Sequence, residues 1–102
     1  MFGNLMGKLQ EVQQKAEEAK AALASARYSC ESDDSQAAAV VDGNGRLVSL
    51  HLHEELLAKG AEEVQKVVLS IVTSAQSEAT AASAEAMKSA AKSLLPGGFP
   101  GL

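Results

Sequence analysis

An apolar stripe with helical spacing runs through the first quarter of the chain. Its members recur at steps of four and three residues and are Leu5, Leu9, Val12, Ala16, Ala19 and Leu23. Residues at these steps share one face of an α-helix, and so narrow a stripe is typical of a helix that packs against another helix. The pattern predicts an N-terminal helix, capped by Asn4, that needs a partner.

Two-residue alternation replaces the helical spacing in the middle of the chain. Three short strands are expected, over 27–31, 36–42 and 46–53. Turn-forming residues 32–35 separate the first two strands, and Asp42-Gly43-Asn44-Gly45 supplies a tight hairpin between the others. On the third strand, Val48, Leu50 and Leu52 would share one face. Strands in this order predict an antiparallel meander with one buried side.

A second helical pattern covers about residues 62–93, after a turn or short helix that ends at Gly60. Its apolar stripe comprises Val64, Val68, Ile71, Ala75, Ala79, Ala82, Ala86 and Ala90. The first half is large enough to pack on a sheet, whereas the alanine half can approach another helix closely or stand partly free as an arm. The predicted fold class is therefore α/β of the α+β type: helix, three-stranded antiparallel meander, long helix.

Pro96 and the glycines after it cannot continue a helix. We expect a single domain over residues 1–95 and a flexible tail over 96–102.

Composition argues that one chain has a thin core. The hydrophobic fraction is 46%, but 19 of the 102 residues are alanine, which buries little area. A small alanine-rich domain gains most from oligomerisation, so a homodimer is expected. The residues expected to pack in the core or the dimer are Leu5, Leu9, Val12, Leu23, Val48, Leu50, Leu52, Val64, Val68 and Ile71.

The net charge of −4 is distributed unevenly. Residues 27–60 carry −3, while residues 1–26 sum to zero and residues 61–102 to −1. The helices can therefore have local basic faces but no strong basic field. From the residues alone, Lys8, Lys15 and Lys20 are better interpreted as an ordinary solvated helix surface.

Cys30 is the single cysteine, which excludes an internal disulfide and fits a reducing compartment. It is expected to pack as a small apolar residue rather than to react. No signal-peptide or membrane-spanning pattern is recognisable, so a cytoplasmic protein without membrane partners is expected.

The chain shows no arrangement of residues that would support catalysis. His51 and His53 would lie on the same face of the third strand and could begin a metal site, but no spaced cluster supplies further ligands, and an exposed sheet face is the better interpretation. No serine lies in a glycine-flanked elbow, and Gly43-Asn44-Gly45 is too short for a phosphate-binding loop. We expect no enzyme activity, cofactor, metal or small-molecule substrate.

The order of several short motifs resembles the YbaB/EbfC nucleoid-associated proteins. The motifs are Met1-Phe2-Gly3-Asn4-Leu5-Met6, Glu31-Ser32, Asp42-Gly43, Leu56-Leu57 and Leu95-Pro96-Gly97-Gly98-Phe99. Each motif is weak singly, but together they cover nearly the whole chain. The resemblance implies a tweezer-shaped homodimer that binds duplex DNA with little sequence preference and associates with the bacterial nucleoid in the cytoplasm.

Carried onto this sequence, the resemblance makes five lysines the phosphate contacts: Lys8, Lys15, Lys20, Lys88 and Lys92. The chain departs from many relatives between Val72 and Met87, where it has no arginine or lysine. Since each phosphate contact contributes to affinity, few lysines predict weak, salt-sensitive binding without base-specific readout.

Two functional hypotheses remain open from the sequence. The first is a dimeric DNA-binding nucleoid protein. The alternative is a protein-interaction or scaffold module of the same fold, in which the alanine-lined arms clasp another protein and the acidic middle of the chain repels nucleic acid.

Overall fold

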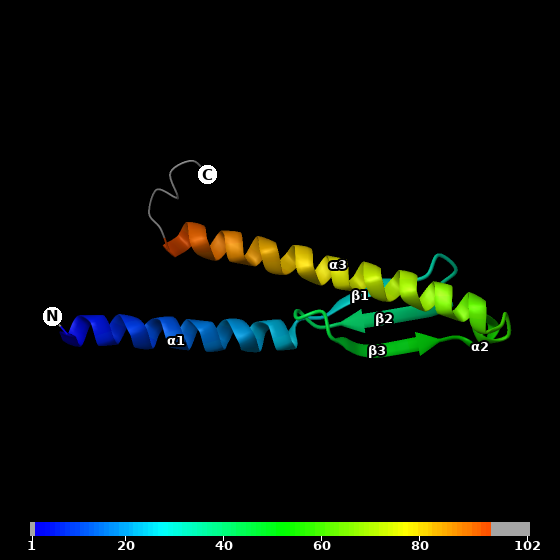
Figure 1. Ribbon diagram of the computed structural model, residues 1–102, viewed down its shortest axis with the longest axis horizontal. Helices are drawn as coiled ribbons and strands as arrows, with labels where there is room; N and C mark the ends of the chain where they lie inside the picture. Colours follow the sequence, from blue (N-terminus) through cyan, green and yellow to red (C-terminus); the bar gives the residue numbers. More distant parts are fainter. Residues whose placement is uncertain (1, 95–102) are drawn as a thin grey trace.

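The computed structural model describes residues 2–94, so the predicted tail lies outside the described residues. The elements are α1 (Phe2–Ser25), β1 (Tyr28–Glu31), β2 (Ala37–Val41), β3 (Leu47–Leu52), α2 (Glu54–Leu57) and α3 (Ala61–Leu94). The molecule is elongated, with principal extents of 68 × 29 × 17 Å (Figure 1). The predicted fold class, a helix followed by a three-stranded sheet and a long helix, is confirmed.

The three strands form an antiparallel meander in the order β1-β2-β3. Cys30 lies opposite Ala39, and Leu50 lies opposite Ala39 from the other side, so these residues share the sheet face on which α3 packs. The opposite face is polar and exposed at Ser29 and His51. The sheet is therefore covered on one side, as an amphipathic meander requires.

The core consists of small side chains where α3 crosses the sheet. Alternate residues of β2 are buried, and they meet the first half of α3 and one leucine of α2. The buried apolar residues are Ala37, Ala39, Val41, Leu56, Ile71, Ala75 and Ala79. Val41 and Leu56 are the largest fully buried side chains. The large apolar residues of the predicted α3 stripe pack on the sheet as expected, but Ala75 and Ala79 of its alanine half are buried there too, and the stripe is exposed only farther along, at Ala86.

Strand β3 is only partly covered, because α3 packs mainly on β1 and β2. Leu50 is 40% exposed, although its neighbour Ala39 on β2 is fully buried. Leu69, from α3, also remains exposed. An apolar strip therefore lies open along β3, while Leu69 is exposed on the side of α3 that faces away from the sheet.

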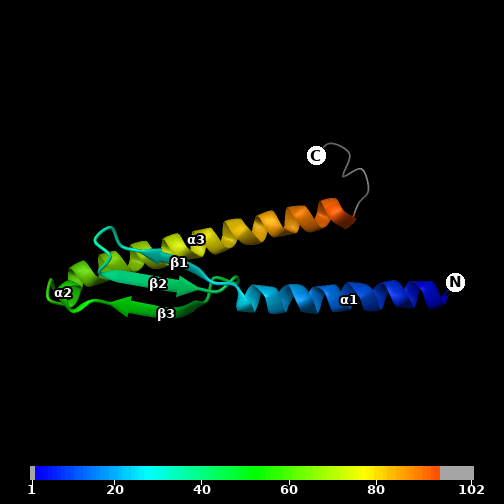
Figure 2. The ribbon, with the colours of Figure 1, turned by 180° about the vertical axis from the view of Figure 1, so that it is seen from behind.

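Helix α1 extends away from the sheet and packs extensively on no other element of residues 2–94 (Figure 2). Its contact with the hairpin is a backbone hydrogen bond, in which the Gly43 N–H donates to the Leu23 carbonyl at 2.8 Å. Leu23 is half-buried, whereas the rest of the predicted stripe is in solvent in the single chain, with Leu9 57% and Val12 64% exposed.

The hairpin turn is organised by the buried carboxylate of Asp42. Asp42 Oδ1 accepts hydrogen bonds from the backbone N–H groups of Asn44 at 2.9 Å and Arg46 at 3.0 Å. Gly45 has a φ of +82°, which a residue without Cβ adopts readily. The turn thus presents Gly43 to the end of α1.

Some local expectations from the sequence were wrong. Helix α1 begins at Phe2, so Asn4 lies inside it rather than at its cap position. Val41 pairs with Leu47 and Val40 with Ser49, so Val48 is an extra residue that interrupts the alternation with Leu50 and Leu52. Strand β3 ends at Leu52 because His53 caps α2, its Nδ1 accepting from the Glu55 N–H at 3.3 Å.

Substituting Gly43 tests whether close backbone contact holds α1 to the hairpin. A Cβ at Gly43 would meet the Leu23 carbonyl oxygen at 2.6 Å and its Cα at 2.9 Å, which requires the backbone to move. Gly43→Ala should therefore lower the midpoint of thermal unfolding followed by circular dichroism.

Gly7→Ala is the matched control, since a Cβ there meets nothing within 4 Å. In an exposed helix interior it should stabilise α1 by roughly 0.5–1 kcal/mol. A Gly43→Ala chain as stable as the Gly7→Ala chain would contradict this account of the junction.

Candidate functional site

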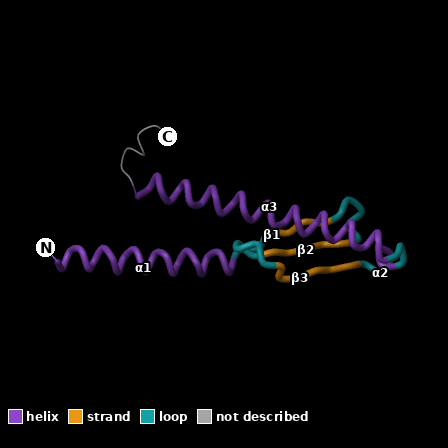
Figure 3. The backbone as a smooth tube through the Cα atoms, viewed as in Figure 1, coloured by secondary structure: helices purple, strands orange, loops and turns teal. Residues whose placement is uncertain are grey.

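Two helical arms project from the same end of the sheet (Figure 3). The first arm is α1, and the second, here called the distal arm, is the part of α3 beyond Ala79, the last buried residue of that helix. At 1.5 Å per residue, α1 is about 36 Å long. The arms form an elongated surface without a sheet behind it.

The five predicted lysines all lie on these arms and are exposed. Lys8 and Lys15 are seven residues apart, on one flank of the apolar stripe, while Lys20 lies on the other flank. Lys88 and Lys92 are four residues apart and share a face of the distal arm. Across residues 2–94, no carboxylate lies within ion-pair distance of any of the five ammonium groups.

The charge of the arms is close to balanced. Helix α1 carries three lysines and the three glutamates Glu11, Glu17 and Glu18. On the distal arm, Lys88 and Lys92 exceed Glu85 by a single positive charge. The arms can therefore make discrete contacts with phosphate groups but generate no broad positive field.

The remaining candidate groups are not brought together. His51 lies on the exposed face of the sheet, whereas His53 caps α2. Cys30 is half-buried against the core, and its thiol donates to the Glu31 carbonyl at 3.7 Å. The described part of the chain contains no group of three or more metal-ligating side chains and no helix long and apolar enough to cross a membrane.

The turn between β1 and β2, predicted only as a connection, is ordered by Asp34. Ser32 Oγ donates to Asp34 Oδ1 at 2.7 Å, the Gln36 N–H donates to the same oxygen at 3.1 Å, and Lys59 Nζ lies 3.6 Å from Oδ2. The Ser32 hydroxyl, followed by the Gln36 amide, lowers the pKa of the Asp34 carboxyl below its usual value of 3.8.

Comparison with known proteins places this architecture in a family. The sequence model of the YbaB/EbfC DNA-binding family matches residues 1–94. The chain belongs to the YbaB/EbfC family. This family comprises DNA-binding, nucleoid-associated proteins, so the predicted resemblance is confirmed.

A solved structure shares the YbaB/EbfC fold of this chain. It is the crystal structure of the uncharacterized protein HP0035 from Helicobacter pylori, with a TM-score of 0.64 and 21% sequence identity. The match covers 92% of this chain and 96% of that chain. No protein with a curated description matches the sequence.

The groove between β1 and the first half of α3 was not predicted from the sequence. Ser32, Asp33 and Asp34 border it from the turn, and Glu63 and Lys66 border it from α3. The concentration of acid in residues 27–60 was the available signal, but these positions are far from Glu63 in sequence, so only the fold shows that they meet.

The titration of Asp34 is a direct test of the ordered turn. We expect a carbon-detected NMR titration to give a pKa below 3.8, and Ser32→Ala to move it back toward that value, because the hydroxyl is the largest cause of the shift. Lys59→Met, which removes a smaller cause, should move it less.

Because the pKa of Asp34 is lowered in the folded chain, its ionisation makes the stability of the fold depend on pH. Ionised Asp34 favours the folded chain at pH values above 3.8, and this contribution is lost as the pH falls through the lower folded value. A wild-type carboxyl that titrates at or above 3.8 would contradict the hydrogen-bonding scheme.

Proposed function

We propose that this protein binds duplex DNA as a homodimer, without sequence preference, through the lysines of its helical arms. It would act in the cytoplasm as a nucleoid-associated protein, with no catalytic step, cofactor or small-molecule substrate. The observation that carries the proposal is the placement of all five lysines, unpaired among the described residues, on arms of a YbaB/EbfC chain.

The exposed apolar surface supports the dimer. The α1 stripe is in solvent in one chain, as is the strip along β3 that contains Leu47 and Leu50. In a twofold-symmetric dimer, a contact between one patch of the first copy and another patch of the second copy is repeated in the opposite direction. A second copy could therefore cover both apolar surfaces of each chain. Exposed apolar surface of this extent is typical of an interface.

In the proposed dimer, α1 of the second copy would pack in a shallow groove on α3. It is lined by small and polar side chains, namely Thr73, Gln76, Ser77, Thr80, Ala81 and Ala84. Gln76 Nε2 donates to the Gly45 carbonyl at 3.1 Å, which places the start of this groove beside the hairpin. Small side chains allow a helix carrying Leu5, Leu9 and Val12 to approach closely.

The spacing of the lysines supports phosphate contacts. Lys8 and Lys15 are separated by about 10 Å along the helix axis, and Lys88 and Lys92 by about 6 Å. Since each DNA strand presents a phosphate every 3.4 Å or so of axis, both pairs can reach separate phosphates. Dimerisation doubles the number of lysines available to the DNA.

The composition of the arms argues against base-specific readout. The arms present no arginine within residues 2–25 and 80–94, and the bidentate pairing with guanine typically uses arginine. Contacts to phosphates alone carry no sequence information, so binding without preference is expected.

A scaffold function is the second candidate. It is favoured by the net charge of −4 and by the apolar stripe on α1, which could clasp another protein instead of a second copy. Its distinguishing result would be a protein partner that is retained after nuclease treatment and after the lysine substitutions described below.

Charged substitutions in the α1 stripe test the dimer. Leu9→Glu with Val12→Glu should convert a particle of twice the 10.5 kDa chain mass into a single chain, as measured by light scattering after gel filtration. Both side chains are exposed in one chain, so the substitutions should leave its fold intact.

Gln10→Glu with Gln14→Glu adds the same charge on the opposite face of α1 and is the matched control. It should leave the dimer unchanged. Equal masses for the two double variants, whether dimeric or monomeric, would contradict the proposed interface.

Reversal of two arm lysines tests DNA binding. Lys8→Glu with Lys92→Glu should weaken binding to a duplex by about tenfold or more in an anisotropy titration, because two phosphate-binding cations per chain become anions. The logarithmic salt slope should become shallower by about 0.9 for each phosphate that the protein no longer neutralises.

The control is Lys59→Glu with Lys66→Glu, which changes the net charge equally on the body of the molecule. The exposed Lys59–Asp34 ion pair contributes little to stability, so the control should fold normally. If both variants weakened binding equally, net charge rather than the arms would determine it, and the lysine assignment would be wrong.

A further inference from the structure

Strand β1 leaves one edge of the sheet unpaired within residues 2–94. The Ser32 N–H donates to the Ala37 carbonyl at 2.9 Å, which makes these residues a hydrogen-bonded pair. Along an antiparallel strand, residues whose backbone N–H and C=O point toward the neighbouring strand alternate with residues whose backbone groups point away from it. The backbone groups of Cys30 therefore point toward β2, like those of Ser32, while those of Ser29 and Glu31 point away from the sheet. The edge thus offers the Ser29 N–H and carbonyl and the Glu31 N–H to an added strand, while the Glu31 carbonyl already accepts from the Cys30 thiol.

A groove of about 430 Å³ runs beside this edge, between β1 and α3. Cys30, Val67 and Ile71 supply its apolar part. Ser70 and Ser74 form part of the α3 side, and their small side chains leave room for larger ones from a ligand. The groove therefore has the two features of a strand-binding site, a free backbone edge and an adjoining apolar surface.

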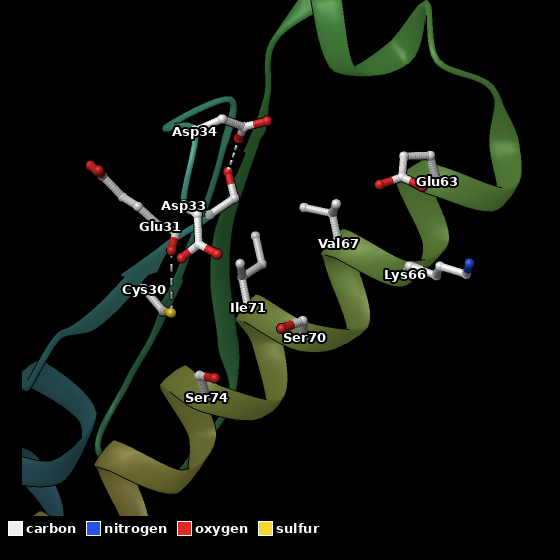
Figure 4. A pocket seen from close by; sticks show the side chains of 11 residues that line it. Cys30, Glu31, Asp33, Asp34, Glu63, Lys66, Val67, Ser70, Ile71 and Ser74 are labelled. Carbon is white, nitrogen blue, oxygen red and sulfur yellow. Dashed lines mark hydrogen bonds between the residues drawn. The ribbon is translucent and has the colours of Figure 1, made fainter.

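The charged residues around the groove are predominantly acidic. Figure 4 shows Asp33 and Glu63 pointing toward the space between the turn and α3, while Lys66 extends to the other side of the helix. Glu31 extends from the opposite face of β1, where Ser35 Oγ lies 3.5 Å from its Oε2. These carboxylates favour a cationic ligand and disfavour DNA.

We infer that the β1 edge binds an extended basic segment of a partner protein, which adds to the sheet as a fourth strand. Side chains of an added strand alternate between the two faces of the sheet. On the α3 side they would meet Val67 and Ile71, and on the other side they would meet Glu31. The segment that fits alternates apolar residues with lysine or arginine.

A second copy of this chain is a poorer occupant of the groove. The exposed apolar surface lies on α1 and along β3, which is the opposite edge of the sheet from β1. Among the strands of residues 2–94, none alternates apolar with basic residues, since β1, β2 and β3 contain no lysine or arginine. The charge complementarity therefore points to a different polypeptide.

The test uses a capped peptide in which lysine and valine alternate, titrated into the full-length ¹⁵N-labelled protein. We expect saturable shifts of the Ser29 and Glu31 amide signals and slower hydrogen exchange at both amides. A peptide of alternating glutamate and valine, and a lysine–valine peptide with N-methylated valines, should each bind at least about tenfold more weakly.

Two variants locate the site. Glu31→Lys with Asp33→Lys should weaken peptide binding about tenfold or more, because Glu31 lies on the face that the lysines of the peptide would meet, whereas Glu78→Lys with Glu85→Lys, an equal change of charge elsewhere on the molecule, should weaken it much less. Ser29→Pro removes an outward N–H that takes no part in pairing with β2, a position where a strand tolerates proline. It should weaken peptide binding and leave duplex binding unchanged, so this inference and the proposed DNA binding can fail separately.

Equal binding of the N-methylated and unmethylated peptides would overturn strand addition. Equal weakening by the two charge-reversal variants would overturn the groove as the site. If Ser29→Pro does not fold, as judged by circular dichroism, the N-methylated peptide still decides the backbone contribution with the wild-type protein.

Discussion

The close packing of α3 on β2 is the interaction on which the rest of the structure depends. Ala37, Ala39 and Val41 let the helix approach the sheet, and Ile71 and Ala75 fill the space between them. Small side chains bring the layers together but bury little apolar area, so stabilisation per residue is modest. One helix also cannot cover three strands, and β3 keeps an apolar surface that the single chain leaves in solvent.

This incomplete cover separates the surface into regions with different chemistry. Apolar side chains remain exposed along β3 and on α1, while carboxylates gather beside β1. The lysines assigned to DNA lie beyond the sheet, on the arms. An acidic protein can therefore contact a polyanion, because the carboxylates of the turn and the start of α3 lie on the body, away from the distal lysines.

The elements themselves were predictable because their apolar periodicity is strong. The switch from helical spacing to alternation and back located all three strands, whereas the point at which α3 leaves the sheet was harder to predict, because Ala75 and Ala79 pack on the sheet and Ala86 does not. Local competition between structures was harder to predict. The bulge at Val48 and the capping role of His53 depend on backbone hydrogen bonds that leave no periodic signal.

The candidate sites differ in how much of them the sequence reveals. The arm lysines could be placed because i, i+4 and i, i+7 positions share a helical face. Their use against DNA remains a prediction. The groove beside β1 contains both Asp33 and Glu63. In the sequence these residues are separated by β2, β3 and α2, so no local pattern could reveal that they lie together.

The Leu23–Gly43 hydrogen bond and the short link to β1 both lie at one end of α1, which gives the helix the mechanics of a lever. With the pivot at one end of a helix about 36 Å long, a tilt of roughly ten degrees displaces the far end by about 6 Å. Such a displacement needs no rearrangement of the sheet, because α1 shares no extensive packing with it. In the single chain, the separation between α1 and the distal arm can therefore change while the core between α3 and β2 keeps its contacts.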